Sequence, residues 1–344
     1  MTMGKMNHYL IMLYPASCLF FTSHSQTTSN TSSQHHCLPD QSSALLQLKQ
    51  EFVEKRMYDY YLDYFLYGYD NSIDNGSYPK MGSWKADTDC CSWDGITCDT
   101  ENGHVVGLNL RSSWLSGTLK SNSSLFNMRH LQKLNLALND FSSSTIPSEF
   151  GQLVSLTHLN LSHSFLSGPI PSEISLLSNL VSLDLSFNYY NYKYLNLKKI
   201  DLETLVQNMT YLRELHLDYM DILSSLPQSL ANLSSLTSLS LSWCGLNGEF
   251  PSNIFQLPKI QKIDLLNNPI LTGFLPEFHS DSSLQILILG STNFFGKIPN
   301  SIGNLESLIW LDLSRSNFSR ELPNSIGNLR SLNHLALSST NLLG

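Results

Sequence analysis

Apolar and polar residues alternate in a short segment that returns along most of the chain. In LTHLNLS, Leu159 and Leu161 alternate with polar neighbours, which is the pattern of a strand with one buried face. The first apolar residue of each such unit is Val105, Leu131, Leu156, Leu180, Leu212, Leu236, Ile260, Leu284, Leu308 or Leu332. Six of the nine intervals between these positions are 24 residues, and the others are 26, 25 and 32. The constant period predicts a repeat protein with one strand in each repeat.

Each strand is followed by a bend, an extended stretch and a helical turn. Three residues after the last strand leucine stands a small side chain, which predicts a bend where it satisfies buried backbone groups: Asn139, Ser164, Asn188, Cys244, Asn268, Thr292, Ser316 and Thr340. A Gly and an Ile-Pro-like pair follow, and a turn such as SIGNLESL leads to the next strand. One unit cannot bury its leucines alone, so ten stacked units form a continuous core. The fold class is therefore an α/β repeat solenoid, a right-handed curved leucine-rich-repeat superhelix with a parallel concave sheet.

The fourth unit is about one third longer than the others. Its extra residues lie in YYNYKYLNLKKIDLETLVQN, between residues 189 and 208. We interpret them as a lengthened outer helical segment, since outward insertions are tolerated in solenoids. A functional island at this place is the alternative.

The first residues have the features of a secretory signal peptide. Lys5 precedes a short apolar run from Tyr9 to Phe21, which gives way to polar and small residues. We predict a signal peptide over residues 1–25, an N-terminal cap over residues 26–102 and about ten repeats over residues 103–344, the last incomplete. Glycosylation sequons support passage through the secretory pathway, and they stand at Asn30, Asn75, Asn122, Asn160, Asn208, Asn232 and Asn317.

Composition and motifs exclude several classes of function. The net charge is −8 and no basic block is present, which argues against nucleic-acid binding. Catalytic signatures such as G-x-S-x-G, H-E-x-x-H and the Gly-rich phosphate loop are missing from the sequence. We therefore expect no enzyme activity and no cofactor.

Cysteines cluster before the repeats, at Cys37, Cys90, Cys91 and Cys98. Neighbouring Cys90 and Cys91 are not expected to pair, which leaves two disulfide connectivities open. A zinc site lacks the usual ligand spacing, so no metal is expected. Cys244 stands at the bend position of its repeat, where we favour a small buried side chain over a reactive thiol.

Side chains that alternate with the strand leucines face the concave surface, where solenoids commonly bind partners. Aromatic and Arg residues are favoured interface anchors, and an acidic row suits a basic partner. The candidate ligand-binding residues are Tyr219, Trp243, Trp310, Arg315, Asp184, Asp218, Asp264 and Asp312. The alternative for each of them is a solvated residue without a partner.

The motif L-x-x-L-x-x-L-x-L-S-x-N-x-L-S-G-x-I-P resembles the plant-type leucine-rich repeat. More narrowly, CLPDQSSALLQLKQEF from Cys37, PKMGSWKADTDCCSWDGITCD from Pro79 and the repeat from His130 resemble plant receptor-like proteins. The resemblance implies that the region from Cys37 to Asp99 is a cap with the disulfides Cys37–Cys90 and Cys91–Cys98. The run from Ala44 would then be the cap helix, lying over the first strand.

Receptor-like proteins of this kind carry a repeat ectodomain and one membrane helix but no kinase, and several confer disease resistance. The resemblance implies that this chain is the N-terminal part of an ectodomain that binds a protein, peptide or glycan and signals through adaptor and co-receptor kinases. The expected location is the extracellular face of the plasma membrane, or the apoplast if no membrane helix follows. The alternatives are a secreted inhibitor of microbial cell-wall hydrolases, similar to polygalacturonase-inhibiting proteins, and a truncated decoy.

Overall fold

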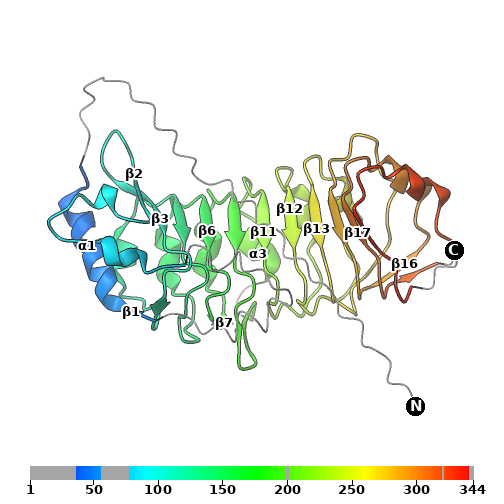
Figure 1. The fold of residues 1–344 in the computed structure, drawn as a ribbon. Helices are drawn as coiled ribbons and strands as arrows, with labels where there is room; N and C mark the ends of the chain where they lie inside the picture. Colours follow the sequence, from blue (N-terminus) through cyan, green and yellow to red (C-terminus); the bar gives the residue numbers. More distant parts are fainter. Residues whose placement is uncertain (1–35, 56–76, 199–200, 320, 341–344) are drawn as a thin grey trace, which may run out of the picture.

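A long parallel sheet runs through the computed structural model, which describes residues 36–55, 77–198, 201–319 and 321–340 (Figure 1). Within these residues one sheet of eleven strands has the order β19-β17-β15-β13-β12-β11-β8-β6-β5-β3-β2. Its strands are β2 (Ile96–Cys98), β3 (Val105–Asn109), β5 (Lys133–Asn135), β6 (His158–Asn160), β8 (Ser182–Asp184), β11 (Glu214–His216), β12 (Ser238–Ser240), β13 (Lys262–Asp264), β15 (Ile286–Ile288), β17 (Trp310–Asp312) and β19 (His334–Ala336). Only β2 pairs antiparallel to its neighbour, β3, so the predicted solenoid with one parallel strand in each repeat is confirmed.

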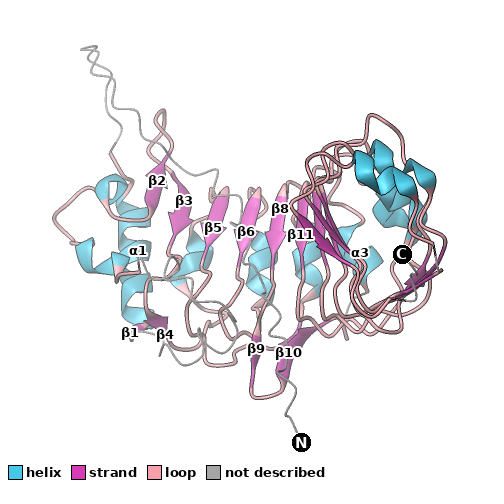
Figure 2. Cartoon of the chain, turned by 45° about the vertical axis from the view of Figure 1, so that its right-hand side comes forward, coloured by secondary structure: helices cyan, strands magenta, loops and turns pink. Residues whose placement is uncertain are grey.

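Shorter elements occupy the remaining sides of each repeat. The other strands are β1 (Val53–Glu54), β4 (Leu115–Ser116), β7 (Gly168–Pro169), β9 (Tyr189–Tyr190), β10 (Lys193–Asn196), β14 (Thr272–Gly273), β16 (Asn293–Gly296) and β18 (Asn317–Phe318), and the helices are α1 (Pro39–Glu51) and α3 (Leu202–Val206). Short 3-10 turns cover Lys80–Ser83, Cys90–Ser92, Ser124–Asn127, Ser148–Gln152, Ser172–Leu176, Gln228–Asn232, Ser252–Gln256, Asn300–Asn304 and Asn324–Asn328. In the repeats these turns stack on the side away from the large sheet (Figure 2). None of the helices in the described residues is long and apolar enough to cross a membrane.

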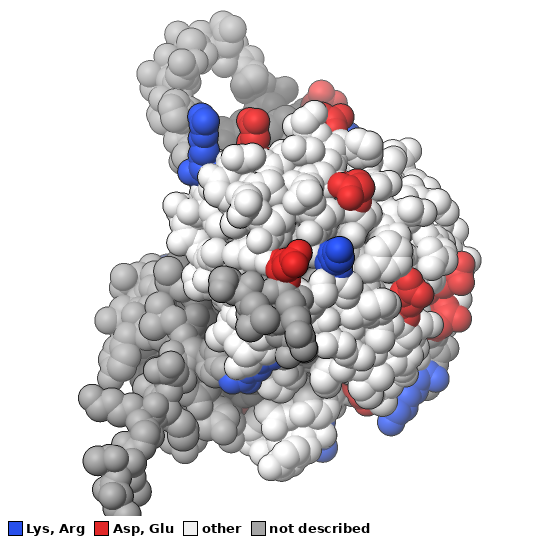
Figure 3. Space-filling view, turned by 90° about the vertical axis from the view of Figure 1, so that its right-hand side faces the viewer, with Lys and Arg blue, Asp and Glu red and all other residues white. Residues whose placement is uncertain are grey.

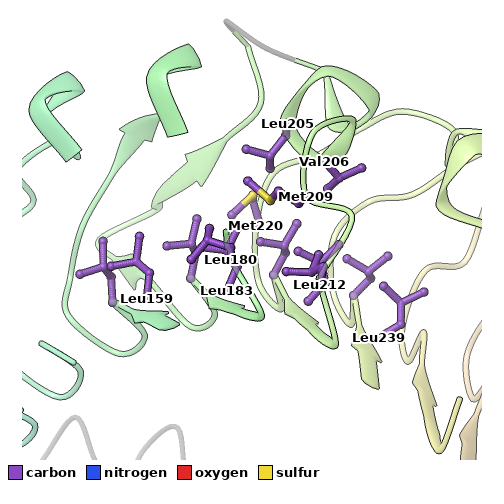
Figure 4. Packing of buried hydrophobic residues seen from close by; sticks show 14 of the residues in the cluster. Leu159, Leu180, Leu183, Leu205, Val206, Met209, Leu212, Met220 and Leu239 are labelled. Carbon is purple, nitrogen blue, oxygen red and sulfur yellow. The ribbon is translucent and has the colours of Figure 1, made fainter. Parts of the chain in front are cut away.

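The core lies between the large sheet and the stacked turns. Leu183 in β8 and Leu215 in β11 are fully buried, and Leu205 and Val206 of α3 pack from the opposite side (Figure 4). Met220 fills the same layer at the bend of the fifth repeat and is 1% exposed. Since each repeat covers the leucines of its neighbour, apolar burial accumulates along the array and not within single repeats.

The N-terminal cap covers the first repeat strand, as the sequence predicts. Helix α1 places Leu45 and Leu48 in the core, and the Gln41 side-chain oxygen accepts a hydrogen bond from the Val105 N–H at 2.6 Å. The helix is longer at its start than the predicted run and ends at Glu51. Disulfides join Cys37 to Cys90 and Cys91 to Cys98, so the expected pairing is confirmed. The predicted signal peptide, Asn30 and Asn75 lie outside the described residues.

The small side chains at the bends form a hydrogen-bonded column through the interior. The Asn188 side-chain oxygen accepts hydrogen bonds from the Ser164 and Leu166 N–H groups of the preceding repeat, at 3.0 and 3.1 Å. Its amide donates to the carbonyls of Leu161 and Leu185 at 2.8 and 3.0 Å. The equivalent asparagines, Asn139 and Asn268, make the same bonds. The predicted role of this position is therefore confirmed.

The extra residues of the fourth unit differ from the predicted outer helix. They form a β-hairpin of β9 and β10, followed by the five-residue helix α3, which the Asp201 carboxylate caps by accepting a hydrogen bond from the Thr204 N–H. The hairpin projects from the edge of the solenoid (Figure 2). The expectation of a long helix was wrong because a two-residue turn at Asn191 and Tyr192, both with positive φ, lets the aromatic run pair with itself.

Replacing Asn188 with Ala tests the column. The change leaves two buried N–H groups and two buried carbonyls without partners, so we expect the free energy of unfolding to fall by about 2–4 kcal/mol. Denaturant unfolding of the purified chain measures this loss. Asn333→Ala is the control, since Asn333 is exposed, and it should change stability by less than about 0.5 kcal/mol. Equal effects of the two variants would contradict a structural role for the column.

Candidate ligand-binding surface

Three residues after each repeat strand comes a residue with left-handed backbone conformation. Ten such residues, one in each repeat, have φ between 51° and 60°: Ser112, Leu138, His163, Phe187, Tyr219, Trp243, Asn267, Ser291, Arg315 and Ser339. The N–H groups of the first nine donate to a carbonyl of the next repeat, as from Phe187 to Asp218 at 2.8 Å and from Tyr219 to Ser242 at 2.9 Å. The positions are therefore held in register along one edge of the concave sheet.

Four consecutive members of this row are aromatic, and they stack on one another. The ring centroids of His163 and Phe187 are 4.6 Å apart, those of Phe187 and Tyr219 are 5.1 Å apart, and those of Tyr219 and Trp243 are 5.3 Å apart. These distances are close to the spacing of neighbouring strands, so the sheet itself brings the rings into contact. We call His163, Phe187, Tyr219 and Trp243 the aromatic ladder. Trp243 stands at its end and is 47% exposed.

The predicted aromatic and Arg anchors separate into two places. Tyr219 and Trp243 belong to the ladder, whereas Trp310 lies in β17 and packs against His334 with ring centroids 3.9 Å apart. Arg315 occupies the same row as Trp243, but Asn267 and Ser291 lie between them. Sequence reasoning missed His163 and Phe187, although both precede the bend residue by one position, as Tyr219 and Trp243 do.

Three of the four predicted carboxylates line up across the sheet. Asp184, Asp264 and Asp312 end their strands, and each accepts a hydrogen bond from the backbone N–H two residues later, at 3.0, 3.2 and 2.8 Å. Asn135 and Asn160 make the same bond in earlier repeats. These side chains therefore stabilise the strand ends, whatever else they contact.

Asp218 does not belong to this row, contrary to the expected alignment. The residue paired with Asp184 across the sheet is His216, and Asp218 lies two residues further along. Its side chain is 6% exposed and accepts hydrogen bonds from the hydroxyls of Ser186, Ser240 and Ser242. Because the hydroxyls of two neighbouring repeats surround it, this carboxylate is a buried link between repeats beneath the concave surface.

Burial changes the ionisation of several groups near the ladder. It raises the pKa of the Tyr219 hydroxyl to about 12, with the Asp218 charge acting in the same direction. Burial also lowers the pKa of the His163 imidazole to about 4, although the charges of Asp184 and Asp218 oppose this shift. The ladder is therefore uncharged at neutral and mildly acidic pH.

Cys244 is a buried free thiol in the column of bend residues. Its Sγ donates to the Leu217 carbonyl of the preceding repeat at 3.2 Å, and three repeats earlier the Ser164 hydroxyl makes the equivalent bond to the Leu136 carbonyl. Burial raises the pKa of this thiol well above its usual value. Cys244 is therefore a small packed side chain, as favoured from the sequence.

Charged residues are sparse on the end of the solenoid that follows β17. Figure 3 shows a few Lys, Arg, Asp and Glu side chains there, some of them side by side, within a largely uncharged surface. This distribution agrees with a chain in which 14% of residues are charged.

The pKa of the Asp264 carboxyl provides a test of whether this side chain is buried at the concave sheet. Burial raises this pKa to about 6, while the Lys262 ammonium at 3.8 Å acts against the shift. The folded state binds more protons between about pH 4 and 6, so this group's contribution to stability is lost as pH rises through that range. We compare the free energy of unfolding of Asp264→Asn with that of the unchanged chain by urea unfolding. The difference, variant minus unchanged chain, should rise by about 1–2 kcal/mol as the pH goes from 4 to 7. A difference that does not vary with pH would count against the buried carboxylate.

Glycan occupancy gives a second test of the surface. Asn122 and Asn232 are exposed, whereas the Asn160 amide in β6 donates to the Asp184 carboxylate at 3.1 Å. A glycan on Asn160 would remove this bond and disturb the strand end, so we expect secreted protein to carry glycans at Asn122 and Asn232 but not at Asn160. Mass spectrometry of glycopeptides measures the occupancy. Equal occupancy at Asn160 and Asn232 would refute this expectation.

Comparison with known proteins places the fold in a family. A model of the leucine rich repeat N-terminal domain matches residues 38–58 and 69–99, and the leucine rich repeat matches residues 130–153, 155–177, 235–257, 283–305 and 307–329. Receptor-like protein 6 of Arabidopsis thaliana is 44% identical over 297 residues, which are 86% of this chain and 29% of that protein. Receptor-like protein Cf-9 of Solanum pimpinellifolium is 39% identical over 301 residues, which are 87% of this chain and 33% of that protein.

A solved receptor has the same architecture. The ectodomain of the Arabidopsis receptor kinase HAESA, in complex with the peptide hormone IDA and the co-receptor SERK1, aligns with a TM-score of 0.61 and 26% identity, over 88% of this chain and 54% of that chain. The chain spans about a third or less of the length of the two receptor-like proteins above. The cap, the repeats and the identity across most of its length show that the chain belongs to the plant leucine-rich-repeat receptor-like proteins.

Proposed function

We propose that the chain is part of an extracellular ligand-recognition ectodomain and that the aromatic ladder anchors the ligand. The observation that carries the proposal is the continuous stack from His163 to Trp243 at the edge of the concave sheet. Aromatic side chains supply large contact areas that lose little conformational entropy on binding. A stack held in register by the backbone is already ordered before a ligand arrives.

The backbone at the ladder positions does not account for the aromatic residues. Left-handed conformation is unfavourable for bulky side chains and is best tolerated by Gly, Asn and Asp. Asn267 shows that Asn fits this row at a φ of 56°. Phe187, Tyr219 and Trp243 thus occupy positions where a smaller residue would satisfy the fold, which supports a role in binding.

The relatives support a peptide as the ligand. HAESA binds a peptide hormone together with a co-receptor, and the receptor-like proteins share this chain's cap and repeats. By analogy, the ligand lies along the concave surface beside the ladder, outside the cell. In the whole protein, adaptor and co-receptor kinases at the plasma membrane would carry the signal onward.

Trp243→Asn tests the ladder as a ligand anchor. Peptides from plant extracellular fluid are passed over the immobilised chain, and bound peptides are identified by mass spectrometry, synthesised and measured by calorimetry. We expect Trp243→Asn to weaken binding at least about tenfold, because exposed Trp anchors dominate interface energies.

Tyr211→Asn is the matched control for this experiment. Tyr211 is 63% exposed and precedes its strand, whereas the ladder residues follow theirs. This variant should bind as the unchanged chain does. Equal binding by Trp243→Asn and the unchanged chain would refute the ladder as the anchor.

A further inference from the structure

The β9–β10 hairpin is an outgrowth that the repeat architecture does not require. Its strands pair antiparallel through Lys193 with Tyr190 and Tyr194 with Tyr189. On its inner side, β10 joins β7 of the preceding repeat in parallel, with Leu195 opposite Gly168. The hairpin is thus attached to the flank of the solenoid by a strand, while its turn points away from it (Figure 2).

The residue at the tip is unfavourable for the turn that it forms. Asn191 and Tyr192 have φ values of 49° and 60°, the arrangement in which Asn-Gly is strongly preferred. Tyr192 replaces that Gly, and its side chain is 87% exposed. Neither turn geometry nor burial therefore accounts for an aromatic residue at this position.

The neighbouring rings support the tip. Tyr189 packs against Tyr194 with ring centroids 4.7 Å apart and meets Tyr192 edge-on at 6.4 Å. Tyr190 contacts Phe165 of the preceding repeat, with ring centroids 5.3 Å apart. A partner that binds here meets a surface that is already ordered, which lowers the entropic cost of association.

The hairpin also differs in charge from the rest of the chain. Residues 187–198 contain Lys193 and Lys198, both exposed, and neither Asp nor Glu, although the whole chain carries a net charge of −8. Burial and, after it, Tyr189 raise the pKa of Tyr194, and the Asp221 carboxylate adds to this shift. The three asparagines of the segment, at positions 188, 191 and 196, are not in glycosylation sequons, so the chain itself places no glycan on the hairpin.

We propose that the β9–β10 hairpin is a docking site for a folded protein partner that presents a hollow for Tyr192 with an acidic rim for Lys193 and Lys198. A run of Tyr and Asn on a rigid turn has the composition of antibody paratopes, in which Tyr provides area and Asn adaptable hydrogen bonds. The hairpin is convex, so its complement is a hollow in a folded surface and not an extended peptide. This site goes beyond the ligand anchor proposed above and involves different residues.

Site-specific photo-crosslinking tests the proposal. The whole chain carries p-benzoylphenylalanine at position 192, or at exposed position 211 as the control, and is expressed and irradiated in plant cells. We expect a product specific to position 192, whose cross-linked peptide maps to a protein surface with neighbouring Asp or Glu residues. The partner identified in this way is then purified for binding measurements.

Tyr192→Gly is the matched variant, because Gly favours the same turn and the hairpin should fold as well or better. With the purified partner we expect this variant to bind at least about tenfold more weakly, and Lys193→Gln with Lys198→Gln to remove most of the salt dependence of binding. An unchanged melting temperature for Tyr192→Gly shows that lost binding is not lost folding.

Four outcomes overturn the proposal. They are cross-linking at 192 no stronger than at 211, cross-links to lipid or glycan only, a cross-linked protein surface without acidic residues, and undiminished partner binding by Tyr192→Gly. Trp243→Asn separates this site from the ligand anchor, since it should leave binding of the hairpin partner unchanged. If Trp243→Asn loses peptide binding but keeps binding of the hairpin partner, the loss is a property of the ladder and not of the hairpin.

Discussion

The need to satisfy backbone groups at the bend after each strand governs this structure. The chain turns inward there, so N–H and carbonyl groups are removed from water and require partners inside the protein. Asn188 and its equivalents supply two acceptor and two donor bonds each, linking one repeat to the preceding one. Ser164 and Cys244 each donate to one carbonyl of the preceding repeat and one of their own. The asparagines, Ser164 and Cys244 therefore couple neighbouring repeats, whereas Thr292 and Ser316 bond a carbonyl of their own repeat.

The register of the repeats turns distant residues into surfaces. Tyr219 and Trp243 are 24 residues apart in the chain, yet their rings stack because equivalent positions of neighbouring repeats are separated by one strand spacing. A single substitution in the ladder row therefore adds or removes one ring from a continuous strip. The hairpin follows a different principle, since its own turn places the tip away from the repeats and frees it from the period. The two surfaces still lie close together, since Tyr194 of the hairpin contributes to the raised pKa of Tyr219 in the ladder.

Much of the architecture was predictable because the period is visible in the residues. The strands, the polar column and the parallel sheet follow from spacing, and the resemblance to plant repeats implied the cap helix and both disulfides. Alignment across the sheet was harder to predict. Asp218 was grouped with the acidic row by its residue type, although the 32-residue interval from Leu180 to Leu212 already places His216 at the position of Asp184, and β pairing confirms this alignment. The hairpin was taken for a helix because an aromatic and polar run has no clear period.

The sequence by itself determined that the chain is a capped leucine-rich-repeat array, because a period of apolar residues can bury its side chains only by stacking. It also determined which side chains alternate with the strand leucines. Only the tertiary structure decided which of them are available for binding. Asp218 became buried because serines of two adjacent repeats surround it, whereas Trp243 stayed exposed because the next position in its row holds only Asn267. Exposure depends on neighbours that are 24 or more residues away, and pairing between strands, not local sequence, brings those neighbours together.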